Sequence, residues 1–505
     1  MKIVLYLLII LILLESCGAS RSSVSATKKY SKEQLLHDYD VFQSALEETH
    51  PGLYWYTSKD SMNAYFDWGR KQIIDSATEP DFRKILTYVI AQVNCGHTTV
   101  RSSKKFSRAA DTIRPKVFPL SLKVWGSRTN EDGDTAVIAT NLFRRDSVLR
   151  RGVRIHSVNG KTIEELIDTM GRYISSDGFN KTHKYQTISN TGTFGRMYTT
   201  LYGLNDKYAV EYFDAKGIIK KTEIPVYDPS KDTALRRAIT ALRPLSKKGQ
   251  RRRRLETTRV LKVDTANRTA FMELHSFGRD YKLRSFFRKS FHNLRKMDIS
   301  HLIIDVRSNG GGSVTNSTLL SKYIAKQSFK IADSLYATDK SSHYGKYIQN
   351  NFWNKLFISF LTKRNKKGEY HFGYYERHHF EPKQKNHFDG EVYILTGGNS
   401  FSATILFAET VKDQENVTVV GEETGGGAYG NTAWLIPDFT LPVTGVRFRL
   451  PLFRLVINNK NPKDGRGLLP EVESAPTQKT VAAASDFKLD KTLELIKADK
   501  EKGNR

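Results

Sequence analysis

The sequence predicts an α/β core with mostly parallel strands in its second half, preceded by a helical segment and a strand-rich segment. Three observations lead to this fold class. From Thr258 onward apolar strands alternate with helices, the first hundred residues carry apolar side chains at helical spacing, and residues 115–228 are richer in strand-like runs. The length of 505 residues allows two or three domains.

The first residues are typical of an export signal. Lys2 precedes twelve uncharged apolar residues, 3–14, which are too few to span a bilayer and suit the apolar region of a signal peptide, residues 1–16. The following Glu15-Ser16-Cys17-Gly18 resembles the site where bacterial lipoproteins are cut and acylated, so Cys17 is predicted to carry a lipid anchor. An ordinary secretory signal is the alternative. The prediction places the protein in the cell envelope, anchored in the outer or inner membrane and facing the periplasm.

Small polar residues make 17–30 a predicted flexible tether, followed by a helical domain over 31–112. Ser31 with Gln34 is a capping-box pattern and predicts the start of the first helix. A second helix is expected to begin near Pro80 and to end at Gly96, directly before His97.

Residues 113–228 are predicted to form a β domain. Within them, 148–166 resembles the signature of PDZ domains, with Gly152 before a strand, an Asn159-Gly160 turn and a helix. PDZ domains bind peptide C-termini by adding a strand to a sheet edge, so the resemblance implies a peptide-binding domain. A β domain with a similar turn and no peptide groove is the alternative.

The chain is strongly basic, with 80 Lys plus Arg against 53 Asp plus Glu and a net charge of +27. The densest run, 247–254, lies in a predicted basic linker over 229–257. No nucleic-acid-binding motif accompanies the charge, so nucleic acid is not an expected partner. A solvated linker, anionic lipid and an envelope polymer stay open as explanations of the run.

The predicted core covers 258–505. Its strands are "TAFMEL", "HLIIDV", "EVYILT" and "VTVVG", its helices lie near 283–295, 317–325 and 403–412, and a last helix docks after Ser485. Two of the strands run directly into glycine-rich turns. Glycines let backbone N–H groups face a bound oxygen, which is the geometry of an oxyanion hole.

Four motifs follow one another in the core: "LIIDVRSNGGG" (302–312), "GGNSFSAT" (397–404), "VVGEETGGG" (419–427) and "DGRGLLPEVE" (464–473). Their order resembles the tail-specific, or C-terminal processing, serine protease family. The resemblance implies a crotonase-like peptidase core, a serine nucleophile, and cleavage of unstructured polypeptide near C-termini. No cofactor is expected. The histidines at 371, 378, 379 and 387 match no common zinc spacing, so no metal is expected either.

The resemblance implies Ser402 as the nucleophile and Ser400 as a supporting residue. The backbone N–H of Ala403, with that of Gly310 or Gly311, is then expected to form the oxyanion hole. At the start of a helix, Ser402 also gains from the helix dipole, which favours developing negative charge. The alternative is that Ser402 only caps this helix.

The expected base is a histidine. One branch of the family has a lysine where this chain has Gly427, which excludes a Ser-Lys pair at the aligned position. The tricorn-like branch uses a histidine from the helical front and an acid near the end, and His97 and Asp464 match these positions. Glu422 and Glu423 are rivals for the acid. Histidine suits the role because its unperturbed pKa lies near working pH.

The predicted function is therefore a serine endopeptidase that acts through an acyl-enzyme on a polypeptide substrate. Two alternatives stay open. Some relatives with this core are catalytically inactive and bind a hydrophobic ligand or peptide, and a basic scaffold for envelope polymer would depend on residues 251–254 instead of Ser402.

Overall fold

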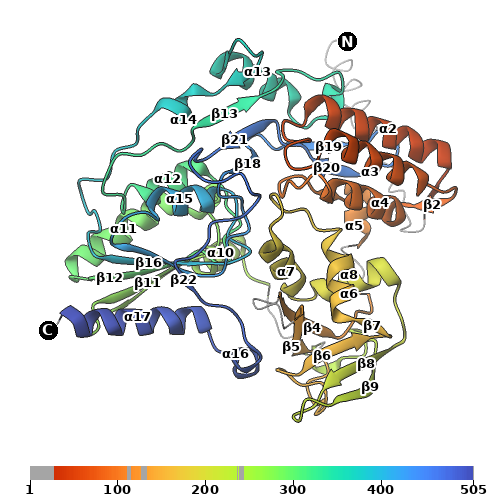
Figure 1. Cartoon of the computed structure of the whole chain (residues 1–505), viewed down its shortest axis with the longest axis horizontal. Helices are drawn as coiled ribbons and strands as arrows, with labels where there is room; N and C mark the ends of the chain where they lie inside the picture. The colour runs from red at the N-terminus through yellow and green to blue at the C-terminus, as the bar shows by residue number, and fades with distance from the viewer. Residues whose placement is uncertain (1–27, 111–114, 127–132, 236, 238–243, 504–505) are drawn as a thin grey trace, which may run out of the picture.

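The computed structural model describes residues 28–110, 115–126, 133–235, 237 and 244–503 (Figure 1). The predicted signal peptide and Cys17 lie outside these residues. Among the helices of the described ranges, none is both long enough and apolar enough to cross a membrane.

The helical front consists of α2 (Lys32–Thr49), α3 (Lys59–Lys71) and α4 (Glu79–Ala91). The Ser31 capping box is confirmed. The prediction that the helix beginning near Pro80 ends at Gly96 is wrong: α4 ends at Ala91, Asn94 adopts a positive φ of 55°, and Gly96 belongs to the turn that follows. The end of the predicted tether is also ordered, because β1 (Lys29–Tyr30) pairs with β2 (Ala77–Thr78).

The β domain is an antiparallel sheet whose main strands run in the order β4-β5-β6-β8-β9. β6 continues through the Asn159-Gly160 turn into the short β7, and both turn residues have positive φ, as the sequence predicts. Helices α6, α7 and α8 pack on this sheet. The bounds are β4 (Leu120–Trp125), β5 (Thr135–Asn141), β6 (Arg154–Val158), β7 (Lys161–Thr162), α6 (Ile163–Gly171), α7 (Lys181–Ser189), α8 (Thr193–Tyr202), β8 (Lys207–Phe213) and β9 (Ile219–Pro225).

Part of the predicted basic linker is a helix, α10 (Lys247–Thr258). Ser246 caps it by accepting the Gly249 N–H at 3.1 Å, and Arg252 pairs with Glu256 one turn later at 2.7 Å. Local capping and spacing of this kind stabilise a helix without a buried face. The side chains of residues 251–254 are exposed.

The core sheet has the order β10-β11-β12-β16-β17-β22, antiparallel between β10 and β11 and parallel from β11 onward. Helices α11, α12 and α15 cover one face and α17 covers the other (Figure 1). The bounds are β10 (Arg259–Asp264), β11 (Thr269–Leu274), α11 (Leu283–Lys296), β12 (His301–Asp305), α12 (Val314–Ser321), β16 (Glu391–Thr396), α15 (Ala403–Val411), β17 (Val417–Gly421), β22 (Val472–Glu473) and α17 (Phe487–Gly503). The motifs at 305–312, 397–404 and 422–427 follow the carboxyl ends of neighbouring parallel strands, so they meet at one sheet edge.

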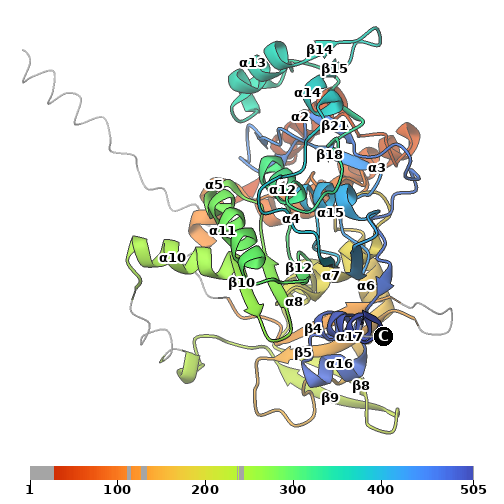
Figure 2. The ribbon, with the colours of Figure 1, turned by 90° about the vertical axis from the view of Figure 1, so that its left-hand side faces the viewer.

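Two smaller sheets join the core to the helical front. A five-stranded sheet has the order β14-β15-β13-β21-β18 and lies beside α13, at the top of the molecule in Figure 2. A three-stranded sheet has the order β19-β20-β3, in which β3 follows His97 directly and pairs with β20. The bounds are β3 (Val100–Arg101), α5 (Lys104–Ala110), β13 (Ser334–Ala337), α13 (Asn351–Leu361), β14 (Lys363–Arg364), β15 (Tyr370–His371), α14 (Gly373–Arg377), β18 (Gly430–Ala433), β19 (Asp438–Thr440), β20 (Arg447–Arg449), β21 (Phe453–Val456) and α16 (Gln478–Ala483).

We expect Asp38→Ala to loosen the helical front from the core. Asp38 of α2 is fully buried and accepts the N–H groups of Val443 and Thr444 at 2.9 and 2.8 Å, together with the Thr444 hydroxyl. Removing the carboxylate leaves three donors without an acceptor, two of them on the buried Thr444, which costs about 3 kcal/mol. The measurement is the urea midpoint of unfolding. Asp40→Ala on the same helix, where the carboxylate is exposed and pairs with Arg70, is the control and should cost less than about 1 kcal/mol; equal losses would contradict the assignment.

Candidate active site

Ser402 stands at the turn between β16 and α15 in a strained backbone conformation, with φ 58° and ψ −123°. Such a conformation costs about 1–3 kcal/mol in a non-glycine residue and persists only where the surroundings enforce it. Ser402 occupies the N-cap position of α15, but its side chain forms no capping hydrogen bond. The half-buried hydroxyl is therefore not used for capping.

The turn is fixed by hydrogen bonds to the strand end and loop that follow β12. The fully buried Ser400 hydroxyl donates to the Val306 carbonyl at 2.8 Å and accepts the Gly397 N–H at 3.2 Å. The Asn309 carbonyl accepts the Phe401 N–H at 3.0 Å and the Thr404 hydroxyl at 2.9 Å. These bonds hold the backbone on both sides of Ser402 and maintain its strain. They give Ser400 the supporting position that the motif implies.

The glycine loop touches the Ser402 turn. Gly311 has φ +96°, and a methyl group on it would lie 2.7 Å from both the Phe401 carbonyl oxygen and Ser402 Cβ. Only glycine fits this approach. The Gly311 N–H already donates to Asn309 Oδ1 at 2.9 Å, whereas Gly310 is exposed and faces open space. Of the two predicted glycines, Gly311 therefore has its N–H already in use within the loop.

Ala403 is the first residue of α15, so its N–H has no acceptor within the helix. The third motif also contacts the Ser402 turn: a methyl group on Gly426 would lie 3.2 Å from the Ser402 backbone nitrogen. The N–H groups of Gly425 and Gly426 donate to the Ser400 carbonyl at 3.0 and 3.1 Å. Two glycine-bearing segments, the loop at Gly311 and the loop at Gly426, therefore converge on the Ser402 turn.

The structure brings His97 to the residue next to Ser402. The imidazole is buried, with 5% of the residue exposed, and packs on the Phe401 ring at a centroid distance of 4.9 Å. Gly96 also lies against Phe401, since a methyl group there would reach 2.4 Å from the ring. Within the described residues, neither ring nitrogen of His97 has a hydrogen-bond partner. The contact is thus through the rings, and the hydrogen bond from Ser402 is not formed.

The carboxylate beside His97 is Asp177, from the loop before α7. Its Oδ1 lies 3.9 Å from His97 Nδ1 and accepts the Gly96 N–H at 2.9 Å, while Oδ2 accepts the Gly427 N–H at 3.2 Å. Asp464, the predicted acid, instead accepts the Arg466 N–H at 2.9 Å. The turn at Asp464 satisfies its own backbone, as aspartate before glycine often does. The sequence offered no motif at Asp177.

Both rival glutamates have other partners. Glu423 forms a bidentate pair with Arg466, both distances being 2.9 Å, and accepts the Gly467 N–H at 2.8 Å. Glu422 pairs with the buried Lys488 at 2.8 Å. These carboxylates link the third motif to the fourth motif and to α17. They therefore stabilise the loops around the site.

Burial sets the charge states of the pair. It lowers the pKa of His97 to about 3, with the nearby charges of Arg449 and His183 acting in the same direction. Burial raises the pKa of Asp177 to about 7, against the opposing effect of its two backbone hydrogen bonds. At neutral pH the imidazole is therefore uncharged, which is the form that accepts a proton.

His183 of α7 is a further site residue without a sequence signal. Its ring packs on Phe401 at 5.1 Å, and Nδ1 lies 2.7 Å from the Gly398 carbonyl oxygen. Phe401 thus contacts a histidine from the helical front and one from the β domain. Only the folded arrangement of three segments shows this.

One group of side chains has donor atoms spaced for a metal ion: those of Cys95, His97 and Asp177 lie within 4.8 Å of one another. Thiolate, imidazole and carboxylate are ligands that zinc accepts. The Cys95 thiol, however, hydrogen-bonds with the hydroxyls of Thr432 and Thr98, and burial raises its pKa to about 11. A metal would have to displace that proton and these bonds.

Ser402 opens on a cavity of about 520 Å³. Its walls include Trp434 and Leu435, both with positive φ, and two cationic groups, Arg279 and Arg449. A cavity with apolar walls and a few polar groups is typical of a ligand site. His97 is not among the described residues that line it.

These features agree with the sequence comparison. The model of peptidase family S41 matches residues 268–474. The core of the chain belongs to peptidase family S41. It is the core of a serine-type peptidase, as the order of the four motifs predicts. No curated protein matches the chain in sequence.

Solved structures extend the similarity of fold beyond the S41 core. The structure of mature CPAF complexed with lactacystin is 13% identical, with a TM-score of 0.61, and the match covers 92% of this chain and 98% of that one. A putative peptidase from Parabacteroides merdae is 13% identical, with a TM-score of 0.43 and coverage of 92% and 96%. The tricorn protease is 14% identical, with a TM-score of 0.41 and coverage of 92% and 37%.

We expect Gly311→Ala to destabilise the fold of the S41 core, because the added methyl group meets the Ser402 turn and the residue has positive φ. The loss should be about 2 kcal/mol or more in the free energy of unfolding. Gly310→Ala, next to it in open space, is the control and should stay within about 0.5 kcal/mol. Urea unfolding of the two variants measures the difference, and similar midpoints would show that the close approach is not maintained.

Proposed function

We propose that the protein is a serine endopeptidase that cleaves unstructured or C-terminal segments of polypeptides through an acyl-enzyme, with Ser402 as the nucleophile, His97 as the base and Asp177 as the acid. The observation that carries this proposal is the strained Ser402 turn, held between a glycine loop and a helix N-terminus and packed through Phe401 on His97. Backbone strain of this kind is found mainly at functional sites.

In the proposed reaction, neutral His97 accepts the Ser402 proton as the hydroxyl attacks the peptide carbonyl. Asp177, ionised above its pKa, stabilises the imidazolium that forms. The N–H groups of Ala403 and Gly310 donate to the oxyanion, and His97 returns the proton to the leaving amine. His97 then removes a proton from a water molecule, and that water hydrolyses the acyl-enzyme.

The Ser402–His97 hydrogen bond has to form during this reaction. The His97 ring nitrogens have no hydrogen-bond partner among the described residues and the ring packs on Phe401, so we propose that one or both rings rotate to bring a ring nitrogen to Ser402. Catalytic hydrogen bonds are often long in free enzymes and tighten when substrate binds. We propose that substrate entering the Ser402 cavity brings about this change.

Two further parts of the proposal concern how substrate and protein are held. The β domain, with its Asn159-Gly160 turn and open edges, is proposed to be PDZ-like and to bind a peptide segment. The lipid anchor at Cys17 would hold the enzyme at a membrane facing the periplasm. The catalytically inactive, ligand-binding alternative is kept as an outcome of the experiment below.

A fluorophosphonate probe tests the assignment. Protein lacking residues 1–17 should be labelled, and Ser402→Ala and His97→Ala should each lose labelling at least about 100-fold. The acid is tested by a matched pair: Asp177→Asn should lose labelling strongly, whereas Asp464→Asn should retain it. Circular dichroism checks folding. A folded protein that neither reacts with the probe nor cleaves an unfolded protein would favour the ligand-binding alternative.

The pH dependence of cleavage tests the role of Asp177 separately. His97 is already neutral well below pH 7, because burial lowers its pKa to about 3. Asp177 becomes charged only as pH rises through about 7. The value of kcat/KM should therefore rise as pH increases through 7, and Asp177→Asn should remove that rise. A rise centred near pH 7 that persists in Asp177→Asn would assign it to another group.

A further inference from the structure

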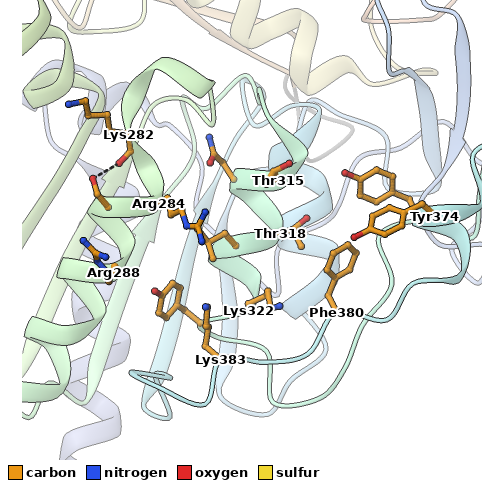
Figure 3. A pocket seen from close by; sticks show the side chains of 14 residues that line it. Lys282, Arg284, Arg288, Thr315, Thr318, Lys322, Tyr374, Phe380 and Lys383 are labelled. Carbon is orange, nitrogen blue, oxygen red and sulfur yellow. Dashed lines mark hydrogen bonds between the residues drawn. The ribbon is translucent and has the colours of Figure 1, made fainter. Parts of the chain in front are cut away.

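A second, larger cavity lies beside the Ser402 cavity and is strongly basic. Its volume is about 900 Å³, and Figure 3 shows its walls, which come from α11, α12 and the segment 374–383. Its cationic side chains are Lys282, Arg284, Arg288, Lys322 and Lys383. Aspartate and glutamate are absent from the residues described around it.

These five cations have no acidic partner within the part of the chain that the structure describes. Among the described residues, none of them forms a salt bridge, while basic side chains elsewhere on the surface, such as Arg172 and Arg268, do. Like charges around one concavity repel each other and produce a positive potential, which a bound anion relieves. On the opposite side of the cavity lie Tyr374 and Phe380 (Figure 3), which offer an apolar wall to the rest of a ligand.

The basic cavity adjoins the Ser402 cavity. Thr315 and Tyr375 line both this cavity and the Ser402 cavity, where Arg279 and Arg449 continue the positive charge. On its other side, Arg288 and Lys383 are shared with a third cavity of about 390 Å³. That cavity adds Lys289, His292 and Lys385. We call this third cavity and the 900 Å³ cavity together the basic groove, and no described residue that lines the groove or the Ser402 cavity is acidic.

We propose that the basic groove binds an acidic segment of the polypeptide substrate while a neighbouring segment of the same substrate lies at Ser402. This inference rests on the proposed peptidase function. The shared walls with the Ser402 cavity favour a polypeptide over other polyanions, because a chain that reaches from one cavity to the other presents its peptide bond to the nucleophile. The hydroxyls of Thr315 and Thr318 and the amide of Asn316 supply neutral hydrogen-bonding groups for carboxylates and backbone.

Binding to Ser402→Ala protein tests the inference without requiring turnover. Two fluorescent peptides are compared by anisotropy, identical except that one carries four Glu where the other carries four Gln. The acidic peptide should bind about tenfold more tightly at low salt, and the difference should shrink as salt screens the charges. In that background, Arg284→Gln/Arg288→Gln/Lys383→Gln should remove the preference.

The control variant, also made in Ser402→Ala, is Lys59→Gln/Lys71→Gln/Lys104→Gln, which lowers net charge equally at exposed positions of the helical front and should keep the preference. Equal binding of the two peptides, or equal losses in both triple variants, would overturn the basic groove as a binding site. Single-stranded DNA that binds as tightly as the acidic peptide and displaces it would overturn the assignment to polypeptide. Failure of probe labelling with the acidic preference intact would refute the peptidase function alone.

Discussion

The arrangement of this site depends on one buried carboxylate. Asp177 accepts backbone N–H groups from Gly96, in the helical front, and from Gly427, in the S41 core. Taking a carboxylate out of water is costly, and these two hydrogen bonds offset only part of the cost, since the pKa of Asp177 remains raised. The same residue therefore holds two distant segments in register and lies beside His97, the proposed base.

The parallel sheet supplies the other constraint. Three of its strands end at the same edge, and each is followed by a turn that packs on the turn of its neighbour. Gly311 and Gly426 approach the Ser402 backbone from two sides, and their lack of side chains permits both contacts. The strained backbone conformation of Ser402 is consequently maintained by the packing around it as well as by the local sequence. A scaffold of this kind can maintain a reactive conformation at low cost to the rest of the fold.

Much of the architecture could be predicted because it depends on local patterns. Apolar strands bounded by glycine predicted four parallel core strands, and the capping box at Ser31 predicted the start of α2. The position of Ser402 at a strand-to-helix turn follows from the order of residues within a single motif. Element boundaries were predicted less well. A glycine often follows the end of a helix, so Gly96 was expected to end the second helix. Its N–H instead donates to Asp177 in a tertiary contact.

The partners of His97 could not be predicted for the same reason. Asp177 and His183 lie in a loop and a helix beside the β domain, without any spacing that marks them, and only folding brings them to Phe401 and Gly96. Asp464 had the better sequence signal, yet its turn satisfies that carboxylate locally. The basic groove is likewise assembled from three separate segments, so the overall charge, which left an anionic partner open, did not indicate where one would bind.

The distribution of the site along the chain has a consequence for the cell that makes it. Position 97 leaves the ribosome early, but position 402 and the strands that bend its backbone follow only after most of the polypeptide has been translated. A nascent chain or a prematurely terminated product would hold a histidine without its serine. Under the proposed function, the order of synthesis thus acts as a safeguard, because no proteolytic centre can assemble before position 402 has been translated.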